Sequence, residues 1–496
     1  MSTVDASEVM RGSRAAAEAL RAVSVARRAE LLGRLRDVVL RRRVDLIGAV
    51  QRETGKCRTD ALASEIFTVL DHLDYLARNA PRITRDRRVS TPLPLLGKKS
   101  RIWFEPLGVA LVISPWNYPL ALGLVPVTSA VAAGNAVIFK PSEHTPLRGV
   151  FEGLFEEAGI PPAWIRIAYG GGEIGASLVD ARPDIVFFTG STGTGRRILE
   201  RAAPLLVPVV LELGGKDAMI VFEDADPGRA AAGALWGTCT NSGQSCTSVE
   251  RLLVHESRYA EIRGEILRQA SAIRLGTDED GDAEMGRIAV PFQEARIRAQ
   301  LDAAARAGAR ITGARWEGGP WVPPMLVEEP GDGPLWNEET FGPVLPMRGF
   351  RNEEEAIRLA NASPYGLSAS VWSKDLARAE RVARRLRVGS VSINNVMLTE
   401  GNAALPFGGV RESGFGRYKG EWGLLSFCNV KSVAIDRDSR KRESHWFPYT
   451  PRKFRLLDSL VAALFGGGWL RLPRFLVAGL RLEMYCARLA RGKEPA

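Results

Sequence analysis

Asp184-Ile-Val-Phe-Phe-Thr-Gly-Ser-Thr-Gly-Thr-Gly195 is the stretch that decides the fold. Its apolar run is typical of a strand buried on both faces, and the small, polar residues 189–195 turn the chain into a helix through Leu199. Two similar apolar runs precede it, at 109–114 and 136–140, and helical segments at 120–133 and 146–158 alternate with them. This alternation predicts a parallel, doubly wound α/β sheet.

The same pattern restarts after Glu212 and predicts a second α/β domain. Residues 8–80 have apolar positions at helical spacing, and 99–104 alternates like a strand. The expected strands of the second domain are 218–222, 251–254, 368–372 and 390–393, and its expected helices are 227–236, 258–273 and 292–307.

The composition describes an ordinary soluble protein of 496 residues, with 45% hydrophobic and 25% charged residues. That length is too great for one core, so we expect two or three domains. Residues 1–18 lack the apolar run of a secretory signal, and the five cysteines form no CxxC pair, which favours a reducing, cytoplasmic setting without structural zinc. None of the four histidines has HExxH spacing, so no metal site is expected.

The net charge of +10 is concentrated at the C-terminus. Residues 451–496 contain nine Lys or Arg and three Asp or Glu, which is +6, and the other 450 residues carry +4. The basic balance therefore describes a tail and is weak evidence for nucleic-acid binding.

Cys246 ends the small, polar run Asn241-Ser-Gly-Gln-Ser-Cys246, where a packing cysteine would have apolar neighbours. Glu212 lies upstream in Leu211-Glu-Leu-Gly-Gly-Lys216. A thiol with a separately placed carboxylate indicates covalent acyl chemistry with a general base. A lone cysteine is more often buried and inert, so this interpretation depends on further motifs that fit the same chemistry.

Seven motifs in order make the chain resemble the NAD(P)-dependent aldehyde dehydrogenases from about residue 8 to residue 437. They are Ser114-Pro-Trp-Asn-Tyr-Pro119, Lys140-Pro-Ser-Glu143, Phe188-Thr-Gly-Ser-Thr192, Leu211-Glu-Leu-Gly-Gly-Lys216, Gly243-Gln-Ser-Cys246, Glu338-Glu-Thr-Phe-Gly-Pro343 and Leu405-Pro-Phe-Gly-Gly409.

The resemblance implies a Rossmann-type cofactor domain, an α/β catalytic domain and a β-arm that joins subunits into a homodimer or homotetramer. Carried over by residue, the cofactor domain is 1–87 with 107–211, the catalytic domain is 212–424, and the arm is 88–106 with 425–437. Residues 438–496 are left as a basic, amphipathic extension.

The resemblance also assigns catalytic roles. Cys246 corresponds to the nucleophile that forms a thiohemiacetal and then a thioester, and Asn117 with the backbone N–H of Cys246 corresponds to the oxyanion donors. Glu212 corresponds to the base that activates the deacylating water; the coenzyme-A-acylating branch lacks it, so a free carboxylic acid is expected. Cys239 lacks the motif and is interpreted as a packing residue.

The cofactor residues implied by the resemblance are Lys140, Glu143, Gly190, Ser191, Gly195, Trp116, Glu339 and Phe341. Lys140 and Glu143 suit an adenosine ribose, because Lys donates and the carboxylate accepts from the hydroxyls. A carboxylate there repels a 2′-phosphate, so NAD is favoured over NADP.

The substrate is expected to be an uncharged aliphatic or aromatic aldehyde. Acid-accepting relatives place an arginine in the helix after the Trp-Asn motif, whereas 120–126 contains no basic residue, and Tyr118, Val125 and Phe407 would line an apolar funnel. Two alternatives stay open: a succinate-semialdehyde-type dehydrogenase acting on an acidic aldehyde, and a thiol esterase on the same fold. The intact set of Cys246, Glu212 and Asn117 argues against a non-catalytic protein.

The C-terminal extension contains two apolar helical segments, 456–465 and 475–489, separated by three glycines and Pro473. Neither reaches the roughly twenty residues that a membrane span requires. The extension either lies in a membrane interface or packs on a subunit, and the sequence favours neither.

Overall fold

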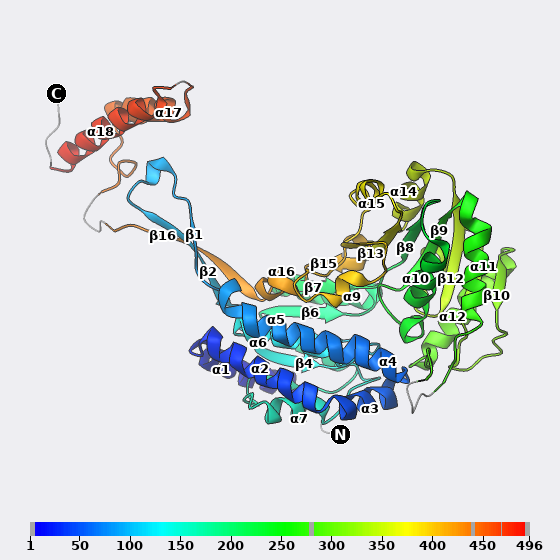
Figure 1. Ribbon diagram of the computed structural model, residues 1–496. Helices are drawn as coiled ribbons and strands as arrows, with labels where there is room; N and C mark the ends of the chain where they lie inside the picture. The colour runs from blue at the N-terminus through cyan, green and yellow to red at the C-terminus, as the bar shows by residue number, and fades with distance from the viewer. Residues whose placement is uncertain (1–4, 277–281, 438–441, 468, 492–496) are drawn as a thin grey trace. The chain divides into compact units, whose positions relative to one another are not determined.

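The structure is a computed structural model that describes residues 5–276, 282–437, 442–467 and 469–491 (Figure 1). The chain divides into two compact units. The larger contains residues 1–86 and 103–431, and the smaller contains residues 87–102 and 432–496.

A six-stranded sheet organises the first half of the larger unit, in the order β15-β7-β6-β3-β4-β5. The five parallel strands run in the spatial order 5-4-3-6-7, so chain direction across the sheet reverses between β3 and β6, as in dinucleotide-binding folds. The predicted parallel, doubly wound sheet is confirmed. The strands are β3 (Val109–Ile113), β4 (Ala136–Lys140), β5 (Ile165–Ile167), β6 (Ile185–Thr189), β7 (Val209–Glu212) and antiparallel β15 (Gly414–Phe415).

Helices cover both faces of this sheet, which explains why its strands are continuous apolar runs. Alternate residues of β3 enter two different cores: Ala110 and Val112 join one, and Val109, Leu111 and Ile113 join the other. The first core is completed by α2 (Val25–Arg41), α3 (Arg43–Thr54), α5 (Thr68–Ile83), α6 (Ala121–Ala133), α7 (Val150–Glu157) and α16 (Gly420–Leu425), and the second by α1 (Ala6–Arg21), α8 (Gly172–Asp180) and α9 (Thr192–Ala202). The short α4 is Arg58–Asp60.

A seven-stranded sheet forms the other half of the larger unit, in the order β10-β11-β12-β9-β8-β13-β14, and all its strands except β10 are parallel to their neighbours. The strands are β8 (Asp217–Val221), β9 (Val249–His255), β10 (Arg310–Gly313), β11 (Met325–Glu328), β12 (Val344–Phe350), β13 (Ser368–Trp372) and β14 (Ser390–Ile393). The helices are α10 (Pro227–Cys239) and α11 (Tyr259–Ala270) on one face, α14 (Glu353–Asn361) and α15 (Leu376–Ala383) on the other, and α12 (Pro291–Arg306) and α13 (Pro334–Asn337) against β11 and β12.

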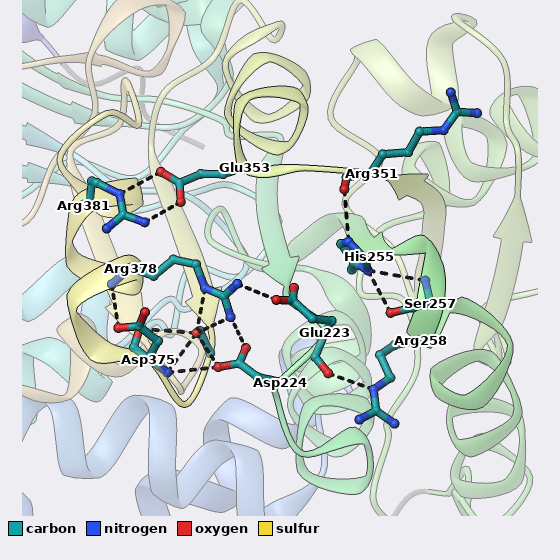
Figure 2. A network of polar contacts seen from close by, with 11 residues as sticks. Glu223, Asp224, His255, Ser257, Arg258, Arg351, Glu353, Asp375, Arg378 and Arg381 are labelled. Atoms are coloured by element: carbon teal, nitrogen blue, oxygen red, sulfur yellow. Dashed lines mark hydrogen bonds and ion pairs between the residues drawn. The ribbon is translucent and has the colours of Figure 1, made fainter.

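A polar network fixes α15 to the end of β8 (Figure 2). Arg378 donates to Glu223 at 2.6 Å and to Asp224, and its guanidinium carbon lies 4.5 Å from the ring centroid of Phe222. Asp375 caps the helix by accepting from the backbone N–H of Arg378 at 3.0 Å. These groups are engaged with one another, so we interpret the network as structural.

The remaining sheet has the order β1-β2-β16 and joins β1 (Arg87–Val89), β2 (Lys99–Pro106) and β16 (Cys428–Ile435). It brings together the two segments that the resemblance assigns to a β-arm; a role in joining subunits stays a prediction. Within the smaller unit, α17 (Pro451–Phe465) packs on α18 (Arg471–Ala490) through buried residues such as Leu464 and Leu482.

Across the described residues, no helix combines the length and the apolar character needed to cross a membrane.

Candidate active site

A cavity of about 590 Å³ opens at the carboxyl ends of β3, β4, β6 and β7 in the larger unit. It lies where chain direction across the sheet reverses, which is the position where open α/β sheets bind their ligands. Ten of the sequence-predicted residues line it: Trp116, Asn117, Lys140, Glu143, Gly190, Ser191, Glu212, Cys246, Glu339 and Phe341. The structure thus brings together residues that are up to 225 positions apart, from 116 to 341.

Lys140 and Glu143 form an ion pair at the end of β4. The Lys140 ammonium donates to Oε2 of Glu143 at 3.2 Å and to the carbonyl of Pro141 at 3.3 Å. Burial opposes ionisation of Glu143, but hydrogen bonds from its own backbone and from Lys140, with the charge of Lys140, lower its pKa below the ordinary value. Glu143 is therefore an ionised acceptor beside a buried donor.

Ser191 caps α9, whose N-terminus borders the cavity. Its Oγ accepts from the backbone N–H of Thr194 at 3.3 Å. A helix N-terminus carries partial positive charge and unpaired N–H groups, so it suits a phosphate. Gly195 does not line the cavity; a Cβ there would lie 2.6 Å from Cδ2 of Leu213, so this glycine allows α9 to pack against the end of β7.

Left-handed backbone shapes the loop that carries Cys246. Asn241, Ser242 and Gly243 have φ values of 51°, 57° and 73°. A Cβ on Gly243 would lie 2.2 Å from the carbonyl carbon of Gly342, so only glycine fits that close approach. The Asp60 carboxylate accepts from the backbone N–H of Asn241 at 2.7 Å and holds the loop from α4.

Asn117 is held from two sides. Its Nδ2 donates to the carbonyl of Gln244 at 3.0 Å, and its own carbonyl accepts from the Lys56 ammonium at 2.8 Å. Lys56 also donates to Glu65 at 2.8 Å, and both side chains of this pair are fully buried. An amide nitrogen carries two hydrogens, so the bond to Gln244 leaves the second available for an oxyanion.

The Lys56–Glu65 pair should be costly to break. Lys56→Met leaves the Glu65 carboxylate buried without its cation, so we expect the free energy of unfolding to fall by about 3–5 kcal/mol. Chemical denaturation measures this loss, and the double variant Lys56→Met/Glu65→Gln should recover part of it. A loss below 1 kcal/mol in the single variant, or no recovery in the double variant, would contradict the role of the pair.

Glu212 ends β7 inside the cavity wall. Burial raises its pKa well above the ordinary value, and the positive charge of Arg417 opposes that shift. Among the described residues, neither carboxylate oxygen meets a hydrogen-bond partner. A Cβ on Gly408 would lie 2.7 Å from Oε1 of Glu212, which gives a physical reason for glycine in the 405–409 motif.

Cys246 is half-buried at the cavity. Burial raises the pKa of its thiol well above the ordinary value, and the charge of Glu400 adds to the shift. Glu400 accepts from the hydroxyl of Thr247, and its carbonyl accepts from the Lys419 ammonium at 2.8 Å. Sequence reasoning missed Glu400 and Lys419, whose only signal is their position near the 405–409 motif.

A second buried pair positions Glu339 and Phe341. Glu250 accepts from the Lys216 ammonium at 2.7 Å and from the backbone N–H of Phe341 at 2.8 Å. Phe341 then lies 5.4 Å, between ring centroids, from Trp116, and Oε1 of Glu339 accepts from the N–H of Gly215 at 3.1 Å. Sequence reasoning quoted Lys216 in a motif but missed the pair.

The three residues predicted to line a substrate funnel lie in the core against which Cys246 packs, and their role in a funnel stays a prediction. Tyr118, Val125 and Phe407 are buried in the core on one face of the six-stranded sheet, and none lines the cavity that contains Cys246. Nearly every residue of α6 is buried, Val125 included, and Leu122 is the residue of this helix that lines the cavity. Leu122, Trp116 and Phe292 supply apolar and aromatic lining instead.

The strand order and the cavity at the strand ends define an α/β fold of the dinucleotide-binding type. The chain belongs to the aldehyde dehydrogenase family, whose model matches residues 1–433. It is 43% identical over 457 residues to a 4,4'-diapolycopene aldehyde oxidase of Methylomonas sp, covering 92% of this chain and 86% of that one. It is 37% identical to a chloroplastic betaine aldehyde dehydrogenase of Atriplex hortensis, covering 77% and 78%.

Solved structures agree with this membership. The chain is similar to betaine aldehyde dehydrogenase of Staphylococcus aureus in complex with NAD+, with a TM-score of 0.83, 32% identity, and coverage of 90% of this chain and 89% of that one. It is likewise similar to the NAD+ complex of an aldehyde dehydrogenase of Bacillus cereus, with a TM-score of 0.83, 33% identity, and coverage of 88% and 89%. The family consists of oxidoreductases that act on aldehydes and use NAD(P).

Proposed function

We propose that this protein oxidises an uncharged aldehyde to the carboxylic acid, with NAD as oxidant and Cys246 as nucleophile. The observation that carries the proposal is that Cys246, Asn117 and Glu212 line the same cavity as Lys140 and Glu143. This shared cavity supports the roles we propose for them: a nucleophile, an oxyanion donor and a base beside a ribose-binding pair.

The residues present fit NAD. An ionised Glu143 beside Lys140 suits ribose hydroxyls and disfavours a 2′-phosphate, and the N-terminus of α9 suits the pyrophosphate. Glu339, Trp116 and Phe341 would surround the nicotinamide end. When bound, the cofactor would supply the hydride acceptor. Gly214 leaves room for the Glu339 side chain at the nicotinamide end, because a Cβ on Gly214 would lie 2.5 Å from Oε1 of Glu339.

The side chains can then work in sequence. The thiol of Cys246 gives its proton to water in the cavity and adds as the thiolate to the aldehyde carbon, and Asn117 Nδ2 with the backbone N–H of Cys246 stabilises the resulting oxyanion. Loss of hydride leaves a thioester on Cys246. Glu212 accepts a proton from the water that hydrolyses this thioester, and its buried, raised-pKa carboxylate is a stronger base than an exposed one.

The substrate class is supported by the charges around Cys246. No residue of α6, from 121 to 133, is charged, so a carboxylate substrate finds no cation there. The charges of Glu400 and Lys419 both act on Cys246 and have opposite signs, so this pair favours neither an acidic nor a cationic aldehyde. The relative named for diapolycopene aldehyde, which is uncharged, is consistent with this preference.

A panel of aldehydes tests the proposal. We expect kcat/KM for NADH formation to be higher for hexanal and benzaldehyde than for succinate semialdehyde or an aminoaldehyde. A clear preference for an acidic or a cationic aldehyde would overturn the proposal that the substrate is uncharged. Ester hydrolysis without NAD, together with no NADH from any aldehyde, would show that the protein is a thiol esterase and not a dehydrogenase.

Glu143 should set the preference for NAD. A hydrogen bond to a charged group is worth about 1.5–3 kcal/mol, so we expect Glu143→Gln to raise KM for NAD by roughly tenfold or more. The difference in kcat/KM between NAD and NADP should become smaller at the same time. Steady-state kinetics with both cofactors measures this, with Glu156→Gln, an exposed carboxylate of α7, as control. A wild-type preference for NADP would contradict the interpretation of the Lys140–Glu143 pair.

A further inference from the structure

We propose that the C-terminal hairpin, defined as residues 446–467 and 469–491, binds the surface of an anionic lipid bilayer. The inference concerns the smaller unit and does not rest on the aldehyde chemistry. It comes from three features of the hairpin: an exposed apolar face on α18, exposed aromatic residues, and a row of arginines.

The helix α18 is apolar on two opposite sides. One side packs on α17 and buries Phe475, Leu482 and Tyr485. The other side exposes Leu472, Leu476, Leu480 and Met484, which recur at every fourth residue and are 49–62% exposed. A helix of a self-contained hairpin needs only the first side, so the second has no partner within the hairpin.

The hairpin also exposes aromatic residues outside α18. Phe454 and Phe465 of α17 are 70% and 76% exposed, and Trp469 in the connection between the helices is 90% exposed. Phe447 and Tyr449, just before α17, are also exposed. Monomeric proteins rarely expose so much apolar surface, and Trp and Tyr favour the boundary between lipid and water.

The positive charge of the hairpin indicates which kind of partner its exposed surface binds. Arg474, Arg481 and Arg488 recur every seven residues, so they form one exposed row along α18 beside its apolar face. Residues 451–496 carry +6 in total. A second copy of the hairpin would bring the same positive charge to the contact, whereas anionic phospholipid headgroups neutralise it and the acyl boundary accepts the apolar side chains.

Vesicle co-sedimentation of the full-length protein tests the inference. We expect binding to vesicles containing phosphatidylglycerol, weak binding to pure phosphatidylcholine, and a loss of binding as salt rises. Leu476→Asn/Leu480→Asn should reduce binding at least about tenfold, because two apolar side chains no longer enter the interface. The matched control is Leu40→Asn/Leu376→Asn, which alters two surface leucines of the larger unit that are 49% and 60% exposed.

The triple variant Arg474→Gln/Arg481→Gln/Arg488→Gln separates charge from apolar contact. It should lose the preference for phosphatidylglycerol and most of the salt dependence. No binding by the wild type at low salt would overturn the inference, as would binding that the leucine pair leaves unchanged. A smaller oligomer in the leucine variant, with lipid binding intact, would assign the surface to a second copy instead.

Discussion

Cys246→Ser is expected to abolish aldehyde oxidation while NAD binding persists. A serine hydroxyl is far less nucleophilic than a thiolate, so NADH formation should fall on the order of 10³-fold or more. The substitution replaces one sulfur atom at the cavity by oxygen and leaves Lys140, Glu143 and the α9 N-terminus in place, so the dissociation constant for NAD should change little. Steady-state kinetics and calorimetric titration with NAD measure the two quantities.

Cys239→Ala is the matched control, because Cys239 is buried against Leu235 and Met285 and does not line the cavity. It should keep most of the activity. Near-normal turnover of Cys246→Ser, with substrate attached to Cys239 or Cys57, would contradict the assignment of the nucleophile.

Glu212→Gln should slow deacylation much more than acylation. The amide has the shape of the carboxylate but cannot accept the proton of the attacking water, and a general base is worth about 10²–10⁴-fold. We therefore expect a burst of NADH, one per active site, followed by slow turnover. Intact-mass measurement should find an acyl adduct, and peptide mapping should place it on Cys246. Loss of folding without any adduct would count against the role of Glu212.

The pH dependence should follow from the same carboxylate. Burial raises the pKa of Glu212, and only the ionised form can accept a proton. The deacylation rate should thus fall as the pH decreases through this raised pKa, at a higher pH than an exposed carboxylate would give. Glu212→Gln should remove this acidic limb, and an unchanged limb in the variant would assign it to another group.

The sequence predicted most of the strands that helices bury on both faces, and it missed the short β7 and β11 together with strands whose apolar pattern is broken. β5 has three residues and contains Arg166, and β10 is largely exposed. β12 contains Pro346, which normally argues against a central strand. The structure tolerates it because the pairing of β12 with β9 begins only at Met347, so no hydrogen bond to β9 is lost.

The cavity-lining residues could be predicted because each lies in a motif with small residues that permit close approach. The buried pairs Lys56–Glu65 and Lys216–Glu250 were missed as positioning groups, because charged residues are usually exposed and a sequence does not show which charges are buried together. The funnel residues stay a prediction for a different reason: apolar residues such as Val125 suit a cavity wall and a core equally well, and they lie in the core that Cys246 contacts.

The most direct test of the central claim follows the atoms of one turnover. The protein is given NAD and an uncharged aldehyde deuterated at its carbonyl carbon, in heavy-oxygen water and without dioxygen, and the products are analysed by mass spectrometry. The account predicts deuterium in the NADH and at least one solvent oxygen in the carboxylic acid, because Cys246 holds the carbon during hydride loss and Glu212 activates the water. A requirement for dioxygen, or deuterium released to the solvent, would contradict it.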